Sequence, residues 1–172
     1  MTEIVHKSQR QIQESLSKRQ KMWSKTRQVL ESRLADDLKE RVCYHYDVYH
    51  TKKYKGKPGW NTEMRVMSIL VDGNPWFCTN PSNWEGDLDV IRDKGIVGDG
   101  WGSEMEYIHQ FLNVLSIDEA IAHDNYFIRL LAVLDARLGK RRIKALADKI
   151  ENEPEWFRKW ILLRTGTQGH AM

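Results

Sequence analysis

Residues 42–50 read VCYHYDVYH, and this stretch decides the fold because its side chains alternate in character at every second position. Successive residues of a strand point to opposite faces of a sheet, so Val42, Tyr44 and Tyr46 share one face. Two further apolar runs follow at residues 64–71 and 76–79, with Asp-Gly-Asn between them. An Asp-Gly pair between apolar runs is typical of a hairpin. The sequence therefore predicts a small antiparallel sheet of about three strands.

Helical spacing is found on both sides of this sheet. Upstream, Trp23, Leu30, Leu34 and Leu38 predict an amphipathic helix from residue 22 to about residue 41. The part of the chain after residue 103 is predicted to be helical throughout. We therefore expect an α+β fold, in which an N-terminal amphipathic helix and a helical C-terminal half flank the sheet.

Local signals set the expected ends of the C-terminal helices. Ser116 and Glu119 form a capping box, which predicts that a short helix begins directly after Ser116. Gly139 is suited to the position just after a helix. Pro154 is expected near the first position of the last helix, which carries Trp156, Phe157 and Trp160 as core residues.

The 172 residues are enough for one domain with a core and too few for two ordinary domains. We expect residues 1–21 to form a polar arm or a marginal helix, and residues 22–172 to form a single α+β domain. No apolar run approaches the length of a membrane span, and the polar N-terminus does not resemble a secretory signal. A cytoplasmic location is therefore expected.

The two cysteines, Cys43 and Cys78, show no metal-ligand spacing and no disulfide pattern. We expect reduced thiols, and neither a metal nor a cofactor is predicted. The oligomeric state cannot be inferred from these features.

Charge is segregated along the chain, although the formal net charge is only +3. Residues 1–41 carry +4, residues 42–60 carry +3, residues 61–118 carry −7, and residues 119–172 carry +3. A chain of this kind either pairs its basic and acidic segments internally or presents them to partners.

The first candidate site is the basic segment, residues 137–144, which contains Arg137, Lys140, Arg141, Arg142 and Lys144. Cations at a helix start oppose the helix dipole, and such an arrangement often has an anion to meet. The anion could be nucleic-acid phosphate or an acidic protein. Internal pairing with the −7 segment, for example with Asp87, Asp89 and Asp93, is the competing interpretation.

A second candidate is the stretch around Lys52, Lys53, Tyr54 and Lys55, where aromatic and basic residues alternate. Aromatic rings stack on unpaired bases and lysines follow phosphates, so the mixture is typical of single-strand binding. Lysines that solvate a hairpin tip are the simpler interpretation.

Two weaker candidates lie elsewhere in the chain. An acidic, tryptophan-rich surface with Trp84, Asp87, Asp89, Asp93 and Trp101 could bind a basic protein. His45, Asp47 and Glu63 could form the centre of a small hydrolase or nuclease, but only if the fold brings them together. The Gly-rich run before Ser103 contains carboxylates that would repel phosphate, so a structural loop is favoured there.

Three motifs taken together carry a resemblance to a known family. They are Trp23-Ser24-Lys25, Arg41-Val42-x-Tyr44-His45, and Asp135-x-Arg137-Leu138-Gly139-Lys140-Arg141. Between about Met22 and Ile150 the chain resembles a small uncharacterised bacterial family of short cytosolic proteins. The resemblance implies a shared fold and no particular activity, cofactor or catalytic residue.

From these features we expect a non-enzymatic binding module that associates with nucleic acid through the basic segment and the Tyr/Lys stretch. Two alternatives stay open. One is a protein-binding inhibitor or adaptor that uses the acidic surface, for example against a nucleic-acid-binding enzyme. The other is a small metal-dependent hydrolase or nuclease.

Overall fold

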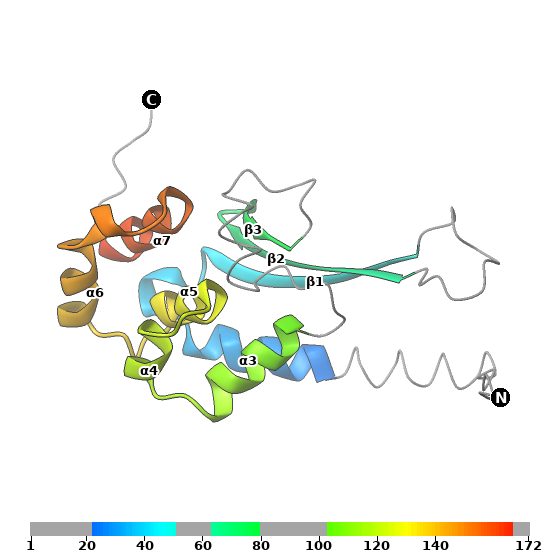
Figure 1. Cartoon of the computed structure of the whole chain (residues 1–172). Helices are drawn as coiled ribbons and strands as arrows, with labels where there is room; N and C mark the ends of the chain where they lie inside the picture. Colours follow the sequence, from blue (N-terminus) through cyan, green and yellow to red (C-terminus); the bar gives the residue numbers. More distant parts are fainter. Residues whose placement is uncertain (1–21, 51–62, 80–102, 167–172) are drawn as a thin grey trace.

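The structure, a computed structural model, describes residues 22–50, 63–79 and 103–166. It has the predicted α+β architecture: a three-stranded sheet lies against a group of helices from the C-terminal half (Figure 1). The N-terminal helix, residues 22–33, lies on the same side of the sheet as α3 (Ser103–Asn113). No helix in the described part of the chain is both long and apolar enough to span a bilayer.

The sheet is formed by β1 (Val42–His50), β2 (Glu63–Val71) and β3 (Asn74–Cys78), in that order and antiparallel throughout. Asp72 and Gly73 join β2 to β3 with φ angles of +52° and +80°. Two successive positive φ angles are the requirement of a two-residue type I′ turn, which confirms the predicted hairpin. The Arg41 guanidinium lies 2.6 Å from the Asp72 carboxylate, and this contact lowers the pKa of Asp72.

The two faces of β1 differ as the alternation predicts. Val42 and Tyr44 are buried, and the Tyr46 ring lies 5.3 Å from the ring of Trp23 on the N-terminal helix. His45 and Asp47 are exposed on the other face. The aromatic face of the strand therefore packs on the core, and the polar face points away from it.

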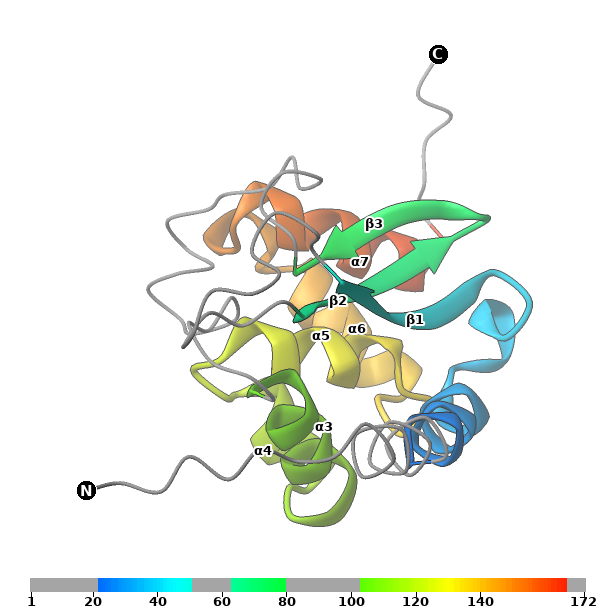
Figure 2. The same ribbon diagram turned by 90° about the vertical axis from the view of Figure 1, so that its right-hand side faces the viewer.

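The centre of the helical half is α5 (Tyr126–Leu134), in which seven of the nine residues are buried and Tyr126 and Arg129 are partly buried. The helices α3, α4 (Ile117–Ile121) and α7 (Glu155–Thr165) pack against it, and α6 (Lys140–Ala147) packs against α7 (Figure 2). Trp156, Phe157 and Trp160 of α7 are buried, as predicted. A helix this apolar is expected only where other elements cover most of its surface.

The helix starts agree with the sequence in part. Both hydrogen bonds of the predicted capping box are present at α4: the Glu119 amide donates to Ser116 Oγ at 3.2 Å, and the Ser116 amide donates to Glu119 Oε2 at 2.8 Å. Pro154 is the N-cap of α7 and lies one position before the predicted one. Gly139 does not follow a helix but precedes one, since it is the N-cap of α6 with a φ of −64°.

The predicted helix to about residue 41 is too long. The N-terminal helix ends at residue 33, because residues 34 and 35 leave it to pair with the end of α5. The Ala35 amide donates to the Leu134 carbonyl at 3.0 Å, and the Ala136 amide donates to the Arg33 carbonyl at 2.8 Å. The short 3-10 helix η1 (Asp36–Leu38) follows and buries Leu38. Amphipathic spacing therefore continues past the point where the helix stops.

Leu134 is fully buried where α5, η1 and the N-terminal helix meet, so its truncation tests the central packing. We expect Leu134→Ala to lower the free energy of unfolding by about 2–5 kcal/mol, because it removes buried methyl groups and leaves a cavity. The matched variant Val114→Ala changes a side chain that is 67% exposed. Urea unfolding should place that control within about 0.5 kcal/mol of the parent protein, and equal losses in both variants would contradict the assignment.

Candidate functional site

A groove of about 920 Å³ lies between η1, α6 and the end of α7. This volume is within the range of sites that hold small molecules or chain segments, roughly 300–1,000 Å³. Its floor is made by small or aliphatic residues that include Ala35, Ala136, Ile143 and Ala147. Asp36 and Asp37 line one wall, the η1 wall, and Lys140 and Lys144 line the other, the α6 wall. Arg164, Thr165 and Gly166 close the groove at the end of α7.

The Arg164 guanidinium holds the segments of the groove together. Its Nε donates to the Val133 carbonyl at 3.0 Å, and its Nη2 donates to the Leu138 carbonyl at 3.3 Å. Its Nη1 donates to Asp37 Oδ1 at 3.1 Å. The side chain is only 10% exposed, so these contacts are made largely out of water. A single guanidinium therefore links η1, the end of α5 and the segment before α6 to α7.

Helix α6, whose Lys140 and Lys144 line the groove, carries cations that have no partner among the described residues. Ile143 is buried and anchors the helix, whereas Lys140, Arg141 and Lys144 are exposed. Lys140 and Lys144 are one helical turn apart, which places their Cβ atoms about 6 Å from each other. Within the described part of the chain, none of these three side chains has a hydrogen bond or an ion pair.

The η1 wall, in contrast, has its charges paired. The Lys39 ammonium lies 2.7 Å from Asp36 Oδ1, and this contact lowers the pKa of Asp36, so the carboxylate is ionised at neutral pH. Asp37 is held by Arg164. The carboxylate of Asp36 stays 94% exposed beside the groove. The groove is therefore asymmetric, with unpaired cations on one wall and paired carboxylates on the other.

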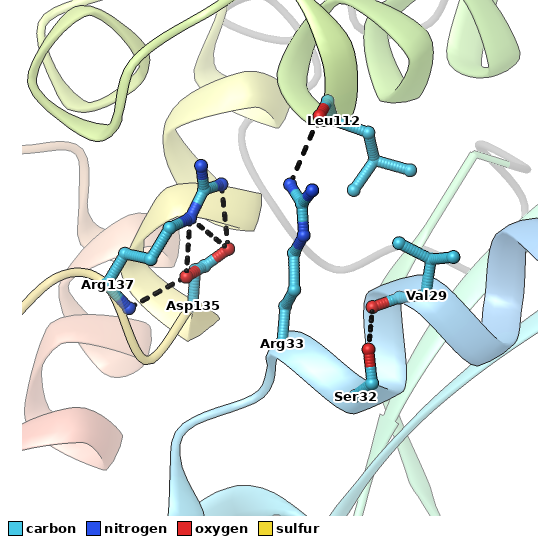
Figure 3. Close-up of polar contacts among 6 residues, drawn as sticks. All are labelled: Val29, Ser32, Arg33, Leu112, Asp135 and Arg137. Atoms are coloured by element: carbon cyan, nitrogen blue, oxygen red, sulfur yellow. Dashed lines mark hydrogen bonds and ion pairs between the residues drawn. The ribbon is translucent and has the colours of Figure 1, made fainter.

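Two arginines of the basic segment form ion pairs with carboxylates of the same chain. The Arg137 guanidinium forms a double contact with Asp135, with Nε at 3.0 Å from Oδ1 and Nη2 at 2.9 Å from Oδ2 (Figure 3). It also lies 5.3 Å from the centre of the Phe111 ring. Arg142 contacts Asp118 at the start of α4, at 2.6 Å. The basic segment is thus divided into structural arginines and exposed cations, and sequence spacing does not distinguish the two.

Arg33 lies beside this cluster, although the sequence does not single it out. Its Nη1 donates to the Leu112 carbonyl in the last turn of α3 at 3.2 Å, and its side chain extends in the same direction as that of Arg137 (Figure 3). At the preceding residue, the Ser32 hydroxyl donates to the carbonyl of Val29, one turn back along the helix, at 2.8 Å (Figure 3). A cation at a helix C-terminus is favoured by the helix dipole. Arg33 therefore has a structural role that its sequence neighbours do not reveal.

Several predicted site residues lie outside the described residues. These are Lys52, Lys53, Tyr54 and Lys55, and the acidic set Trp84, Asp87, Asp89, Asp93 and Trp101. Internal pairing of the basic segment with the acidic set therefore stays a prediction. The ends of β1 and β2 that flank residues 51–62 lie at the opposite end of the molecule from α6 (Figure 1).

The residues of the hydrolase hypothesis are not brought together into a site. His45 and Asp47 are exposed on one face of β1, opposite Ser68 and Val66 of β2, and no hydrogen bond between the pair is found in the described residues. Glu63 is opposite His50, three residues beyond Asp47 along the ladder. Among residues 22–50, 63–79 and 103–166, no group of three or more His, Cys, Asp or Glu side chains could hold a metal ion.

Both cysteines are free thiols, as the sequence predicts. Cys78 is buried on β3, and the Ser68 hydroxyl donates to its sulfur at 3.5 Å. Cys43 is half-buried on β1, and burial raises the pKa of its thiol. A raised pKa keeps a thiol protonated and unreactive at neutral pH.

These observations define an α+β protein whose surface carries a groove with one cationic wall. The chain belongs to the SF0329 protein family, whose model matches residues 22–95 and 103–165. The match begins at residue 22, as does the resemblance drawn from the sequence motifs. Comparison with curated proteins and comparison with solved structures return no match.

The division of the basic segment into ion-paired arginines and exposed cations can be tested by measuring the free energy of unfolding of variants. The Asp135 side chain is completely buried, so Arg137→Ala leaves its carboxylate without the guanidinium partner. We expect a loss of about 1–3 kcal/mol in the free energy of unfolding, the usual effect of leaving a buried polar group unsatisfied. The partial exposure of Arg137, 40%, favours the lower part of this range.

Arg141→Ala is the matched control, because it removes the same side chain from an exposed position of α6. Denaturant unfolding should place it within about 0.5 kcal/mol of the parent protein. If Arg141→Ala lowers the free energy of unfolding more than Arg137→Ala does, then Arg141, and not Arg137, has the structural role.

Proposed function

We propose that the protein binds nucleic acid and that Lys140, Arg141 and Lys144 of α6 contact the phosphates. The observation that carries this proposal is a pair of exposed lysines on the wall of a groove, Lys140 and Lys144, with the exposed Arg141 beside them on α6; none of the three has a partner in the described residues. Lysine and arginine side chains that neutralise phosphates supply most of the sequence-independent affinity of nucleic-acid-binding proteins. Arg137 and Arg142 contribute less, because carboxylates of the protein already hold their guanidinium groups.

The placement of these cations is unfavourable in the free protein. The first turn of α6 contains no acidic residue, and its N-cap, Gly139, has no side chain that could accept a hydrogen bond. Lys140 and Arg141 lie in the first turn, where a cation costs about 0.3–1 kcal/mol through the dipole. Lys144 lies in the last turn, and its charge one turn from Lys140 adds a like-charge cost. A bound phosphate relieves both costs, so the local arrangement favours anion binding.

The proposal includes the Tyr/Lys stretch, with Lys52, Lys53, Tyr54 and Lys55, as a second contact region for bases and phosphates. It also places the protein in the bacterial cytoplasm, where nucleic acid is accessible. Free thiols such as Cys43 and Cys78 are the usual state of cysteine in that reducing compartment.

Salt dependence is the direct test of phosphate contacts. In a fluorescence-anisotropy titration with a labelled single-stranded oligonucleotide, the Lys140→Gln/Lys144→Gln variant should bind about tenfold more weakly at about 50 mM salt. The slope of log K against log salt should also fall in magnitude by about 0.7 for each phosphate contact that is lost. Exposed lysines make no fold-dependent contact, so the thermal midpoint should not change.

The control is Lys25→Gln, which removes an exposed charge from the N-terminal helix. It should keep the slope of the parent protein, since that helix does not line the groove. If the Lys140→Gln/Lys144→Gln variant keeps the parent slope of log K against log salt, the proposal is wrong. It is also wrong if the parent protein does not bind at about 50 mM salt, where such contacts are strong.

A further inference from the structure

The asymmetry of the groove bears on the kind of nucleic acid that it can take. Its α6 wall offers the unpaired ammonium groups of Lys140 and Lys144. On its η1 wall, the carboxylates of Asp36 and Asp37 are paired with Lys39 beside the groove and with Arg164 at the end of α7. We infer that the groove accepts single-stranded nucleic acid in preference to a double helix, with phosphates along α6 and sugars and bases toward η1. The inference rests on the proposed nucleic-acid binding.

A double helix fits this charge pattern poorly. It carries a row of phosphates on each strand, so a duplex that rests on the α6 wall brings its second strand toward the opposite side of the groove. The Asp36 side chain, which lines the groove and is 94% exposed, then comes near those phosphates, and like charges placed together across an interface are unfavourable. The η1 wall has no cation in the described residues that is not already paired. In the described residues, the groove therefore offers unpaired cations to the phosphates of one strand only.

A single strand can satisfy both walls at once. Lys140 and Lys144 are one helical turn apart, with their Cβ atoms about 6 Å from each other, so their ammonium groups can each take one of two successive phosphates. The floor of Ala35, Ala136, Ile143 and Ala147 leaves space for sugars and bases and offers them apolar contact. The carboxylates of Asp36 and Asp37 can accept hydrogen bonds from base amino groups, as acidic side chains do from cytosine N4.

Asp36→Asn is the sharpest test, because the side chain is 94% exposed and its contact with Lys39 lies at the surface. The substitution removes the carboxylate charge and releases the Lys39 ammonium, so the η1 wall gains a cation for a second strand. The probes are a labelled single strand of about 12 nucleotides, within the usual site size of such binders, and the duplex of the same sequence. Both are titrated at the same salt concentration.

We expect the parent protein to bind the single strand at least about tenfold more tightly than the duplex. In Asp36→Asn the ratio of the duplex Kd to the single-strand Kd should fall by about threefold or more, because the duplex binds more tightly once the repulsive charge is gone. The control Asp47→Asn makes the same change in net charge on the exposed face of β1 and should leave the ratio unchanged.

Equal or tighter binding of the duplex by the parent protein overturns this inference and leaves the proposed function standing. The same holds if Asp36→Asn and Asp47→Asn shift the ratio equally. If the parent protein binds neither probe at about 50 mM salt, both the inference and the proposed function are wrong. Binding of a poly-glutamate peptide in place of either probe would assign the groove to an acidic protein partner.

Discussion

The burial of seven of the nine residues of α5 is the constraint on which the rest of the structure depends. A helix so deeply buried must have its terminal amides and carbonyls satisfied inside the protein, because water has little access to them. At the N-terminus, Asn125 Oδ1 accepts hydrogen bonds from the amides of Phe127 and Ile128 at 2.9 Å and 3.3 Å. At the C-terminus, the carbonyls of Val133 and Leu134 are taken by Arg164 and by the Ala35 amide. Both ends of the helix therefore dictate where other segments must lie.

The groove is a product of these C-terminal contacts. Pairing with residues 34 and 35 ends the N-terminal helix and directs the chain into η1, which supplies one wall. Arg164 fixes the end of α7 against the same carbonyls and holds Asp37. Asp135 and Arg137 then set the direction of the chain that enters α6, which supplies the other wall. The positions of the exposed lysines thus follow from hydrogen bonds made several residues away from them.

The sequence predicts those features that depend on neighbours in the chain. Alternation in β1, the turn at Asp72 and Gly73, and the capping box at Ser116 are each determined by residues within one turn of a helix or a few positions of a strand. The groove could not be predicted in this way, since Asp37 and Arg164 are 127 residues apart. The end of the N-terminal helix is likewise not predictable from its neighbours, because its cause is a bridge between Leu34 and Asp135, which are distant in the sequence. The basic segment was recognised as charged, but its division into paired arginines and exposed cations needs Asp118 and Asp135 in place.

The walls of the groove come from three stretches, residues 35–37, 136–147 and 164–166, that are distant in sequence. An unfolded chain cannot bring these stretches together, so a ligand of the groove binds the native state alone. Binding to the native state alone adds RT ln(1 + [L]/Kd) to the free energy of unfolding, about 2.7 kcal/mol when the ligand is at a hundred times its dissociation constant. Occupancy of the groove therefore raises the stability of the folded chain. A rise in the melting temperature detects a ligand of the groove even when the function of the protein is not known.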